Sequence, residues 1–201
     1  YSNLIDRYLI ASEAQDIQPV LVVNKIDMLE GGEHSYIQQL ITDYQKVGYE
    51  VLEVSVKTGA GIDKLKDYLA AHTSIFVGQS GVGKSSLINQ LQPDANILVG
   101  ALSEGTDKGT HTTTASRLFH LKNGGHLIDS PGIREFAVTN LSDEQIIDGF
   151  IEFRPFLGHC KFRDCKHKIE LGCALLEAAE KGKILDVRLQ NYRNILASQD
   201  E

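Results

Sequence analysis

The stretch Gly78-Gln79-Ser80-Gly81-Val82-Gly83-Lys84-Ser85 decides how the fold of this chain is interpreted. It matches the phosphate-loop pattern Gly-x4-Gly-Lys-Ser/Thr, in which glycines let the backbone wrap phosphates with its N–H groups pointing inward. The apolar run 74–77 predicts a strand before the loop, and Ser85–Leu91 predicts a helix after it, whose N-terminus favours negative charge. A chance Gly-rich turn does not explain both neighbours. The residues expected at the phosphates are Gly78, Gln79, Ser80, Gly81, Val82, Gly83, Lys84, Ser85 and Ser86.

Each of two side chains in this loop has a specific expected role. Lys84 is expected to hold the β- and γ-phosphates and to act in catalysis, and the Ser85 hydroxyl to bind Mg²⁺. The loop therefore predicts a bound nucleotide together with Mg²⁺, and the base-reading residues around Asp27 predict that this nucleotide is GTP or GDP.

Outward from the loop, helices and strands alternate, which predicts a mostly parallel α/β sheet. The Asn123-Gly124 step predicts a hairpin, and Ser142 with Gln145 predicts a capped helix ending near Arg154 and Pro155. The helices expected from periodicity are Leu4–Ala14, Ser35–Val47, Ile62–Ala71 and Ala174–Leu196 with a break at 181–183. The expected strands are Pro19–Val23, Tyr49–Val54, Ser74–Val77, Thr114–Leu121 and His126–Asp129.

Asn24-Lys25-Ile26-Asp27 follows the apolar strand 19–23 and is interpreted as a base-reading motif. A carboxylate there accepts both the N1–H and the 2-amino group of guanine, whereas adenine has neither, so Asp27 selects guanine. Asn24 is expected to tie this segment to the phosphate loop, and the Lys25 stem to cover one face of the base. The pattern alone is weak, because Asn and Asp are ordinary turn residues after a strand.

Ser55-Val56-Lys57 follows the next strand and is typical of a second base-contacting loop, in which a backbone N–H meets guanine O6. Its value lies in its position, one strand after Asp27.

The remaining GTPase elements lie between 109 and 132. Asp129-Ser130-Pro131-Gly132 fits the element that holds Mg²⁺ through water at Asp129 and senses the γ-phosphate at the Gly132 N–H. Thr113 is the favoured Mg²⁺ ligand within the run 112–114. Ile133 stands where many GTPases carry a water-orienting Gln, so His111 is a substitute candidate, and its spacing fits a solvated loop histidine equally well.

The order of these elements is rotated. An ordinary GTPase runs from the phosphate loop to the base-reading loops, whereas here the base-reading loops come first. Because all of them lie at the carboxyl edge of one sheet, the site survives the change in order. The chain is interpreted as a circularly permuted P-loop GTPase. A strand between those at 19–23 and 74–77 would have to precede residue 4, so we expect that the chain is incomplete or that residues outside it supply the strand.

Near the C-terminal end, three thiols and one imidazole fall within fourteen residues, a Cys₃His set suited to tetrahedral Zn²⁺. The expected ligands are Cys160, Cys165, His167 and Cys173. His159 is a rival ligand, and three buried free cysteines beside a surface histidine are the plain alternative. The predicted domains are a GTPase domain at 1–154 and a small helical zinc-binding domain at 155–201.

Charge is unevenly divided along the 201 residues, whose net charge is −7. Residues 154–193 hold nine Lys/Arg and five Asp/Glu, a net of +4, whereas residues 1–153 carry a net of −9. The basic part suits a polyanion and the acidic part another partner. No run of apolar residues is long enough to span a bilayer.

The combination resembles the RsgA (YjeQ) family of circularly permuted small-ribosomal-subunit biogenesis GTPases. The shared features are the motif order, Gly-Thr-His-Thr-Thr-Thr at 109–114, Asp-Ser-Pro-Gly at 129–132 and Cys-x4-Cys-x-His-x5-Cys. The resemblance implies a GTPase that docks on ribosomal RNA late in small-subunit maturation and hydrolyses GTP when the subunit stimulates it. It also implies a role in hydrolysis for His111 and an N-terminal oligonucleotide-binding barrel, which this sequence lacks. We expect a cytoplasmic monomer with no membrane partner.

Two other functions remain open from the residues. One is an RNA-binding protein that uses GTP only as a conformational clamp, and the other is a P-loop ATPase or kinase, which Asp27 disfavours.

Overall fold

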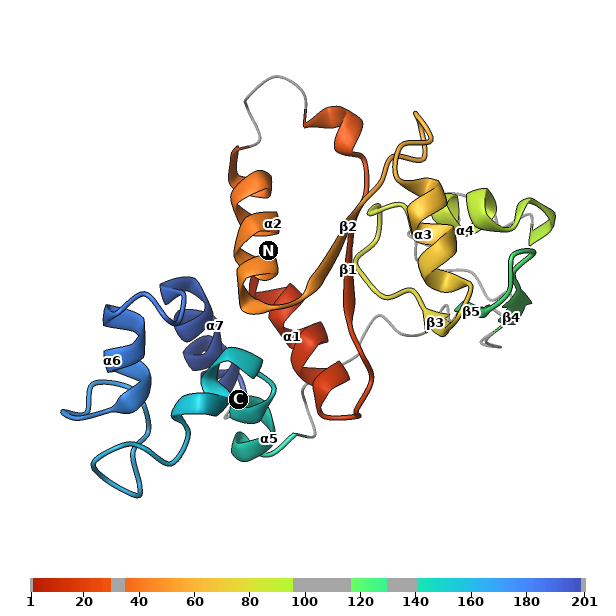
Figure 1. The fold of residues 1–201 in the computed structure, drawn as a ribbon. Coiled ribbons are helices and arrows are strands. Elements are labelled where there is room, and N and C mark those ends of the chain that lie inside the picture. Colours follow the sequence, from red (N-terminus) through yellow and green to blue (C-terminus); the bar gives the residue numbers. More distant parts are fainter. Residues whose placement is uncertain (1, 30–34, 96–116, 130–140, 200–201) are drawn as a thin grey trace, which may run out of the picture. The chain divides into compact units, whose positions relative to one another are not determined.

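A computed structural model of the chain describes residues 2–29, 35–95, 117–129 and 141–199 (Figure 1). The chain divides into two compact units. Unit 1 consists of residues 1–19, 39–50 and 136–201, and unit 2 of residues 20–38 and 51–135. Unit 1 contains segments from both sides of residue 154, because the units are compact bodies and not groups of motifs. The domain boundary expected at residue 154 therefore stays a prediction. No helix in the described part is both long and apolar enough to cross a membrane.

The described part of unit 2 carries five strands in two sheets. β1 (Val20–Val23) and β2 (Glu50–Glu53) form one, and β3 (Thr73–Ile75), β5 (His126–Asp129) and β4 (Arg117–His120) form the other. β3 and β5 are parallel, with Ile75 opposite Ile128, and β4 and β5 form the predicted antiparallel hairpin. Among the described residues no strand pairs with both β1 and β3, so the strands lie in two separate sheets there, and the expected missing strand stays a prediction.

The helices of unit 2 cover these strands with aliphatic side chains. They are α3 (Ile62–Leu69) and α4 (Lys84–Leu91), with the 3-10 turns η1 (Ile26–Met28) and η2 (Pro93–Ala95). Leu65 and Leu69 of α3 and Leu87 and Ile88 of α4 are buried in one cluster with Leu127 of β5. This core fixes the strand ends from which the loops of the nucleotide site emerge.

Unit 1 is helical. Its elements are α1 (Ser2–Glu13), most of α2 (Ser35–Val47), α5 (Asp143–Asp148), the 3-10 helix η4 (Ile151–Phe156), α6 (Ala174–Glu180) and α7 (Asp186–Ala197). Phe150 and Phe153 stack with ring centroids 4.7 Å apart, and Tyr192 of α7 meets both rings edge-on. Ile10 and Ile146 complete this core with the buried Cys173.

The helix expected to run from Ser142 to about residue 154 is shorter than predicted. Its start is confirmed, since the Ser142 and Gln145 side chains cap each other's backbone N–H groups. The α-helix nevertheless ends at Asp148, and a 3-10 helix follows from Ile151. A Cβ at Gly149 would lie 2.8 Å from Ile10 Cγ2, so α1 approaches the backbone closely at this point. The break between α6 and α7 is confirmed, with Gly182 at φ 67°.

An ion network that the sequence did not predict is buried in unit 1. The Arg188 guanidinium of α7 donates to the Asp6 carboxylate of α1 at 2.5 Å and to both carboxylate oxygens of Glu152 at 2.6 and 2.9 Å. Asn191 and Tyr44 donate to the same Asp6 carboxylate. Burial raises the pKa of Asp6, and the charge of Arg188 opposes that rise. The network joins α1, α2, η4 and α7 through groups that could not be buried alone.

Candidate functional site

The phosphate loop follows β3 and turns into α4, as the sequence predicted. Gly78, Gly81 and Gly83 have φ of 146°, 80° and 98°, a region of backbone conformation that residues with a Cβ rarely adopt. Lys84 begins α4, and its Nζ donates to the carbonyls of Gly78 at 2.5 Å and Gln79 at 2.7 Å. The ammonium group is thus held inside the loop that would surround the phosphates.

The base-reading segment is bonded directly to this loop. Asn24 Nδ2 donates to the Val82 carbonyl at 3.1 Å, and Lys25 Nζ to the Gly81 carbonyl at 2.9 Å. Lys25 itself has φ 65° and ψ 35°, a left-handed conformation that is uncommon outside glycine and is often found at functional sites. A Cβ at Gly83 would lie 2.3 Å from Asn24 Nδ2, so the two loops leave no room for a side chain there. The expected tie through Asn24 is present.

The predicted second base loop contacts Asp27. The buried Ser55 donates its hydroxyl to Asp27 Oδ1 at 2.6 Å, and Lys57 Nζ lies 3.6 Å from Asp27 Oδ2. The Ser55 hydrogen bond is the main cause that holds the pKa of Asp27 below its ordinary value, so the carboxylate stays ionised. Backbone bonds from Val54 to Val23 and from Ile26 to Val54 join the two segments. Sequence reasoning gave Ser55 a contact with the base and missed its role as the partner of Asp27.

The other expected nucleotide residues are only partly described. Asp129 ends β5, and the parallel register with β3 brings the backbone there to the same edge as the phosphate loop. Ser85 lies in the first turn of α4. His111, Thr113 and Gly132 lie outside the described residues.

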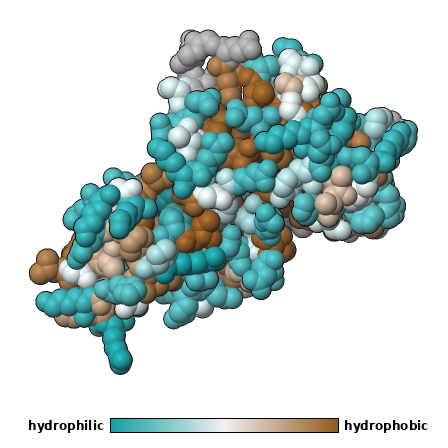
Figure 2. Space-filling view, in the orientation of Figure 1, coloured by the Kyte–Doolittle hydropathy of each residue, from teal (hydrophilic) through white to brown (hydrophobic). Residues whose placement is uncertain are grey.

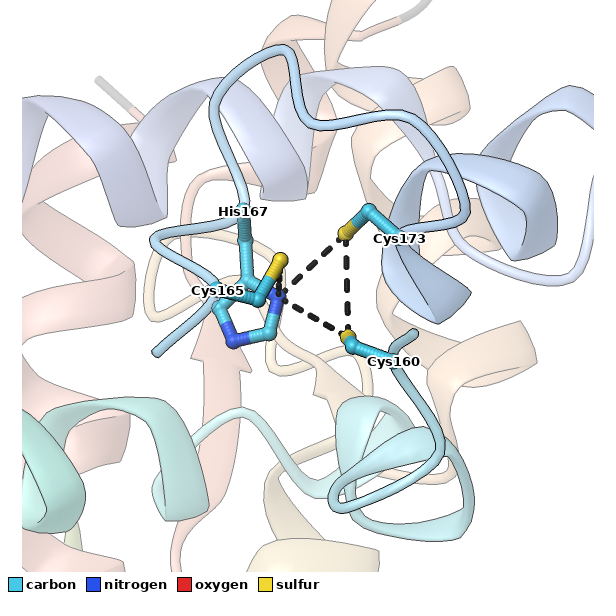
Figure 3. Close-up of side chains that lie close together, drawn as sticks. All are labelled: Cys160, Cys165, His167 and Cys173. Carbon is cyan, nitrogen blue, oxygen red and sulfur yellow. Dashed lines mark hydrogen bonds between the residues drawn. The ribbon is translucent and has the colours of Figure 1, made fainter. Parts of the chain in front are cut away.

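The four expected zinc ligands converge in unit 1 (Figure 3). His167 Nδ1 lies 3.5, 3.6 and 3.3 Å from the sulfurs of Cys160, Cys165 and Cys173, and the sulfurs of Cys160 and Cys173 are 3.9 Å apart. Zn–S bonds of about 2.3 Å and Zn–N bonds of about 2.0–2.1 Å in a tetrahedron give nitrogen–sulfur separations of about 3.5 Å and sulfur–sulfur separations of about 3.8 Å. The donor set and its spacing therefore fit Zn²⁺. His159 is not in the cluster.

Two residues that the sequence did not predict brace the loop that carries these ligands, residues 160–173, called here the Cys₃His loop. The Glu170 carboxylate accepts the backbone N–H groups of Lys166, Lys168 and Ile169 at 2.7–3.0 Å. Hydrogen bonds from backbone N–H groups lower the pKa of Glu170 to about 2. Arg193 of α7 donates to the carbonyls of His167 and Lys168. The spacing of charged residues in the sequence gave no signal for either role, because Glu170 and Arg193 both bond to backbone groups and not to each other's side chains.

Comparison with known proteins gives a family and two solved structures of the same fold. A family model described as RsgA GTPase matches residues 1–139. A relative from Pseudomonas aeruginosa (strain LESB58), described as "Small ribosomal subunit biogenesis GTPase RsgA", is 54% identical over 201 residues, which are 100% of this chain and 59% of the relative. One from Actinobacillus pleuropneumoniae serotype 5b (strain L20), with the same description, is 54% identical over 199 residues, 99% of this chain and 58% of the relative. The chain thus spans about three fifths of the length of these curated relatives.

Two solved structures share the fold. The crystal structure of YjeQ from Thermotoga maritima has a TM-score of 0.82 at 31% identity, with 99% of this chain and 66% of that one covered. YloQ, described as a circularly permuted GTPase, has a TM-score of 0.75 at 31% identity, with 100% and 63% covered. Together with the Cys₃His cluster, this likeness confirms the predicted fold class.

Proposed function

This chain belongs to the RsgA GTPase family, and from that premise we propose that it binds and hydrolyses GTP while docked on the small ribosomal subunit during late assembly. The observation that carries the proposal is the bonded set formed by Asp27, Ser55, Asn24 and the phosphate loop. A carboxylate for the base and a glycine loop for the phosphates are joined in one place, as a guanine nucleotide requires.

Base selection is assigned to Asp27. Its ionised carboxylate accepts from guanine N1–H and the 2-amino group, while Ser55 donates to Oδ1 and Lys57 pairs with Oδ2. An adenine nucleotide would leave this carboxylate without those donors, which disfavours its binding. The Lys25 stem covers one face of the base, and its ammonium stays on the Gly81 carbonyl.

Phosphate binding and hydrolysis are assigned to the loop and to residues near it in the sequence. Lys84 would hold the β- and γ-phosphates, Ser85 and Thr113 would ligate Mg²⁺, and Asp129 would hold the ion through water. When bound, Mg²⁺ neutralises charge on the phosphates. His111 orients or accepts a proton from the attacking water, since Ile133 has no polar group for this task.

The proposed partner is the small subunit and its ribosomal RNA. The basic C-terminal part, with a zinc ion held by Cys160, Cys165, His167 and Cys173, supplies a positively charged docking surface. Ribosome assembly places such a chain in the cytoplasm, and nothing in the proposed activity requires more than a monomer.

GTP turnover by the chain, measured with and without purified small subunits, tests the proposal. We expect slow intrinsic turnover, which can be as low as about 10⁻⁴ s⁻¹ in GTPases, and a large increase with subunits. His111→Ala is expected to remove most of the increase while GTP still binds. Turnover that subunits do not raise, or that is the same in His111→Ala, would instead indicate an RNA-binding clamp. ATP binding as tight as GTP binding would indicate an ATPase or kinase.

A further inference from the structure

Three large apolar side chains on the Cys₃His loop face solvent. Ile169 is 91% exposed, Leu171 84% and Phe162 48%, although the loop contributes the buried Cys173 to the core of unit 1. In Figure 2 brown, apolar atoms reach the surface beside teal, hydrophilic ones in the region around α6 and the loop before it. Single exposed apolar residues are normal, but three within ten residues of one short loop are the kind of feature that marks an interaction site.

The loop holds these side chains in a fixed backbone. Glu170, which lies between Ile169 and Leu171, accepts three backbone N–H groups of the loop, and Arg193 fixes two of its carbonyls. The Lys161 N–H donates to the Gly172 carbonyl at 2.9 Å, which brings the Phe162 and Leu171 ends of the loop together. A partner that binds here does not have to order the loop first, so less conformational entropy is lost on binding.

Positive charge surrounds the apolar side chains. Four cations lie within the loop, namely Lys161, Arg163, Lys166 and Lys168, and all four are exposed. In the described part of the chain none of them forms an ion pair. Of the two carboxylates within the loop, Glu170 is already bonded to backbone, which leaves Asp164; outside the loop, Glu144 of α5 interacts with Lys166.

Phe162 combines both properties in one place. Its ring is half exposed, and Lys161 Nζ lies over one face of the ring, 5.4 Å from its centroid. This arrangement suits a nucleobase with its phosphate, because a base can stack on the opposite face of the ring while the ammonium meets the backbone charge.

We propose that the Cys₃His loop binds unpaired RNA nucleotides, with a base stacked on Phe162, Ile169 and Leu171 against the apolar edges, and the loop cations on the phosphates. This rests on the proposed function, which supplies RNA as the partner. A duplex offers phosphates but no free base faces, so the exposed apolar groups would gain nothing from it. A protein partner is disfavoured, because lysine is depleted in protein–protein interfaces.

The inference is tested on the zinc-loaded chain by fluorescence anisotropy with a labelled, unstructured RNA of about twelve nucleotides, within the usual range of single-strand site sizes. Phe162→Leu keeps the apolar bulk but removes the aromatic face. It is expected to weaken binding about 5- to 150-fold, the range of one base-stacking contact, without changing the salt dependence. Phe162→Tyr is expected to restore binding, and a duplex of the same length to bind more weakly than the single strand.

Removing a cation, unlike removing the aromatic ring, is expected to change the salt dependence of RNA binding. Arg163→Gln is expected to lower the slope of log affinity against log salt by about 0.7, the loss of one phosphate contact on a single strand. Val187→Ala, which shortens an exposed apolar side chain on α7, is the matched control and is expected to bind like the unmodified chain. Zinc content and melting temperature of each variant establish that it is folded.

Three results would overturn the inference. They are RNA binding unchanged in Phe162→Leu, duplex bound as tightly as single strand, and Phe162→Leu weakening binding to the subunit but not to RNA, which would indicate a protein partner. Subunit-stimulated GTP turnover separates this inference from the proposed function. If subunits stimulate GTP turnover but the RNA does not bind, only the inference is contradicted. If the RNA binds but subunits do not stimulate GTP turnover, only the proposed function is contradicted.

Discussion

The nucleotide site joins residues as far apart in the chain as Asn24 and Val82, whereas the Cys₃His site takes its four candidate ligands from residues 160–173. In the first, each contact depends on which strand end a loop follows, so the order of the segments along the chain can be rotated without changing the site. In the second, the ligand spacing itself makes the site. One site is therefore sensitive to contacts between loops, and the other to the metal and to the braces on a single loop.

Zinc removal should produce the largest effect and should be confined to unit 1. Structural Zn²⁺ contributes about 10–16 kcal/mol of apparent binding free energy in small zinc domains. Cys165→Ser, or treatment with a strong chelator, is expected to remove the metal and to lower the melting temperature of the helical unit. Zinc stoichiometry and circular dichroism give the readout. If GTP binding is lost to the same degree as the metal, the two sites are not independent and the comparison fails.

The buried Arg188 network tests how far unit 1 depends on the metal alone. Arg188→Ala leaves the carboxylates of Asp6 and Glu152 buried without their cation, and is expected to cost about 3–5 kcal/mol of unfolding free energy. The matched control is Arg154→Ala, which breaks the more exposed pairs with Glu13 and Asp148 and is expected to cost at most about 1 kcal/mol. Urea unfolding measures both. Equal losses would show that Arg188 acts only through its bulk.

Two glycines in the phosphate loop isolate the contact between loops. Gly81→Ala and Gly83→Ala both place a side chain at positive φ, which costs about 1–3 kcal/mol. Only Gly83→Ala also meets Asn24, since a Cβ at Gly81 has nothing within 4 Å. We expect GTP affinity, measured by calorimetry, to fall further in Gly83→Ala. Equal affinities would mean that the Asn24 bridge does not matter for binding.

The smallest expected effect is a shift in the pH dependence of GTP binding. The pKa of Asp27 is lowered mainly by Ser55, so guanine recognition is complete above the ordinary carboxyl range and is lost as pH falls through the lowered value. Ser55→Ala removes that hydrogen bond and raises the pKa of Asp27, which moves the acid loss of binding to higher pH. An acid limb at the same pH in both proteins would assign that limb to another group.

What the sequence predicted well was of two kinds. Contiguous patterns, such as the Cys₃His set and the capping box at Ser142, carry their geometry in their spacing, and both the convergence of the four side chains and the capping bonds were found where expected. The α2 and β5 bounds also agree, because period and turn residues mark their ends.

What it missed depends on tertiary contacts. Arg188 lies on a helix, where an arginine is expected to face solvent. Only the fold shows that it is buried and pairs with two carboxylates. Gly149, where α5 ends, lies against Ile10 of α1, a contact over more than a hundred residues. The hydroxyl bond from Ser55 to Asp27 likewise joins two loops whose pairing no local pattern specifies.

If contacts between distant loops build a site for guanine, GTP and ATP should compete very unequally for the chain. We expect GTP to displace a bound fluorescent guanine nucleotide about 10⁴- to 10⁵-fold better than ATP, and Asp27→Asn to remove most of this preference. ATP competing as well as GTP in the unmodified chain, or a preference unchanged in Asp27→Asn, would contradict this expectation.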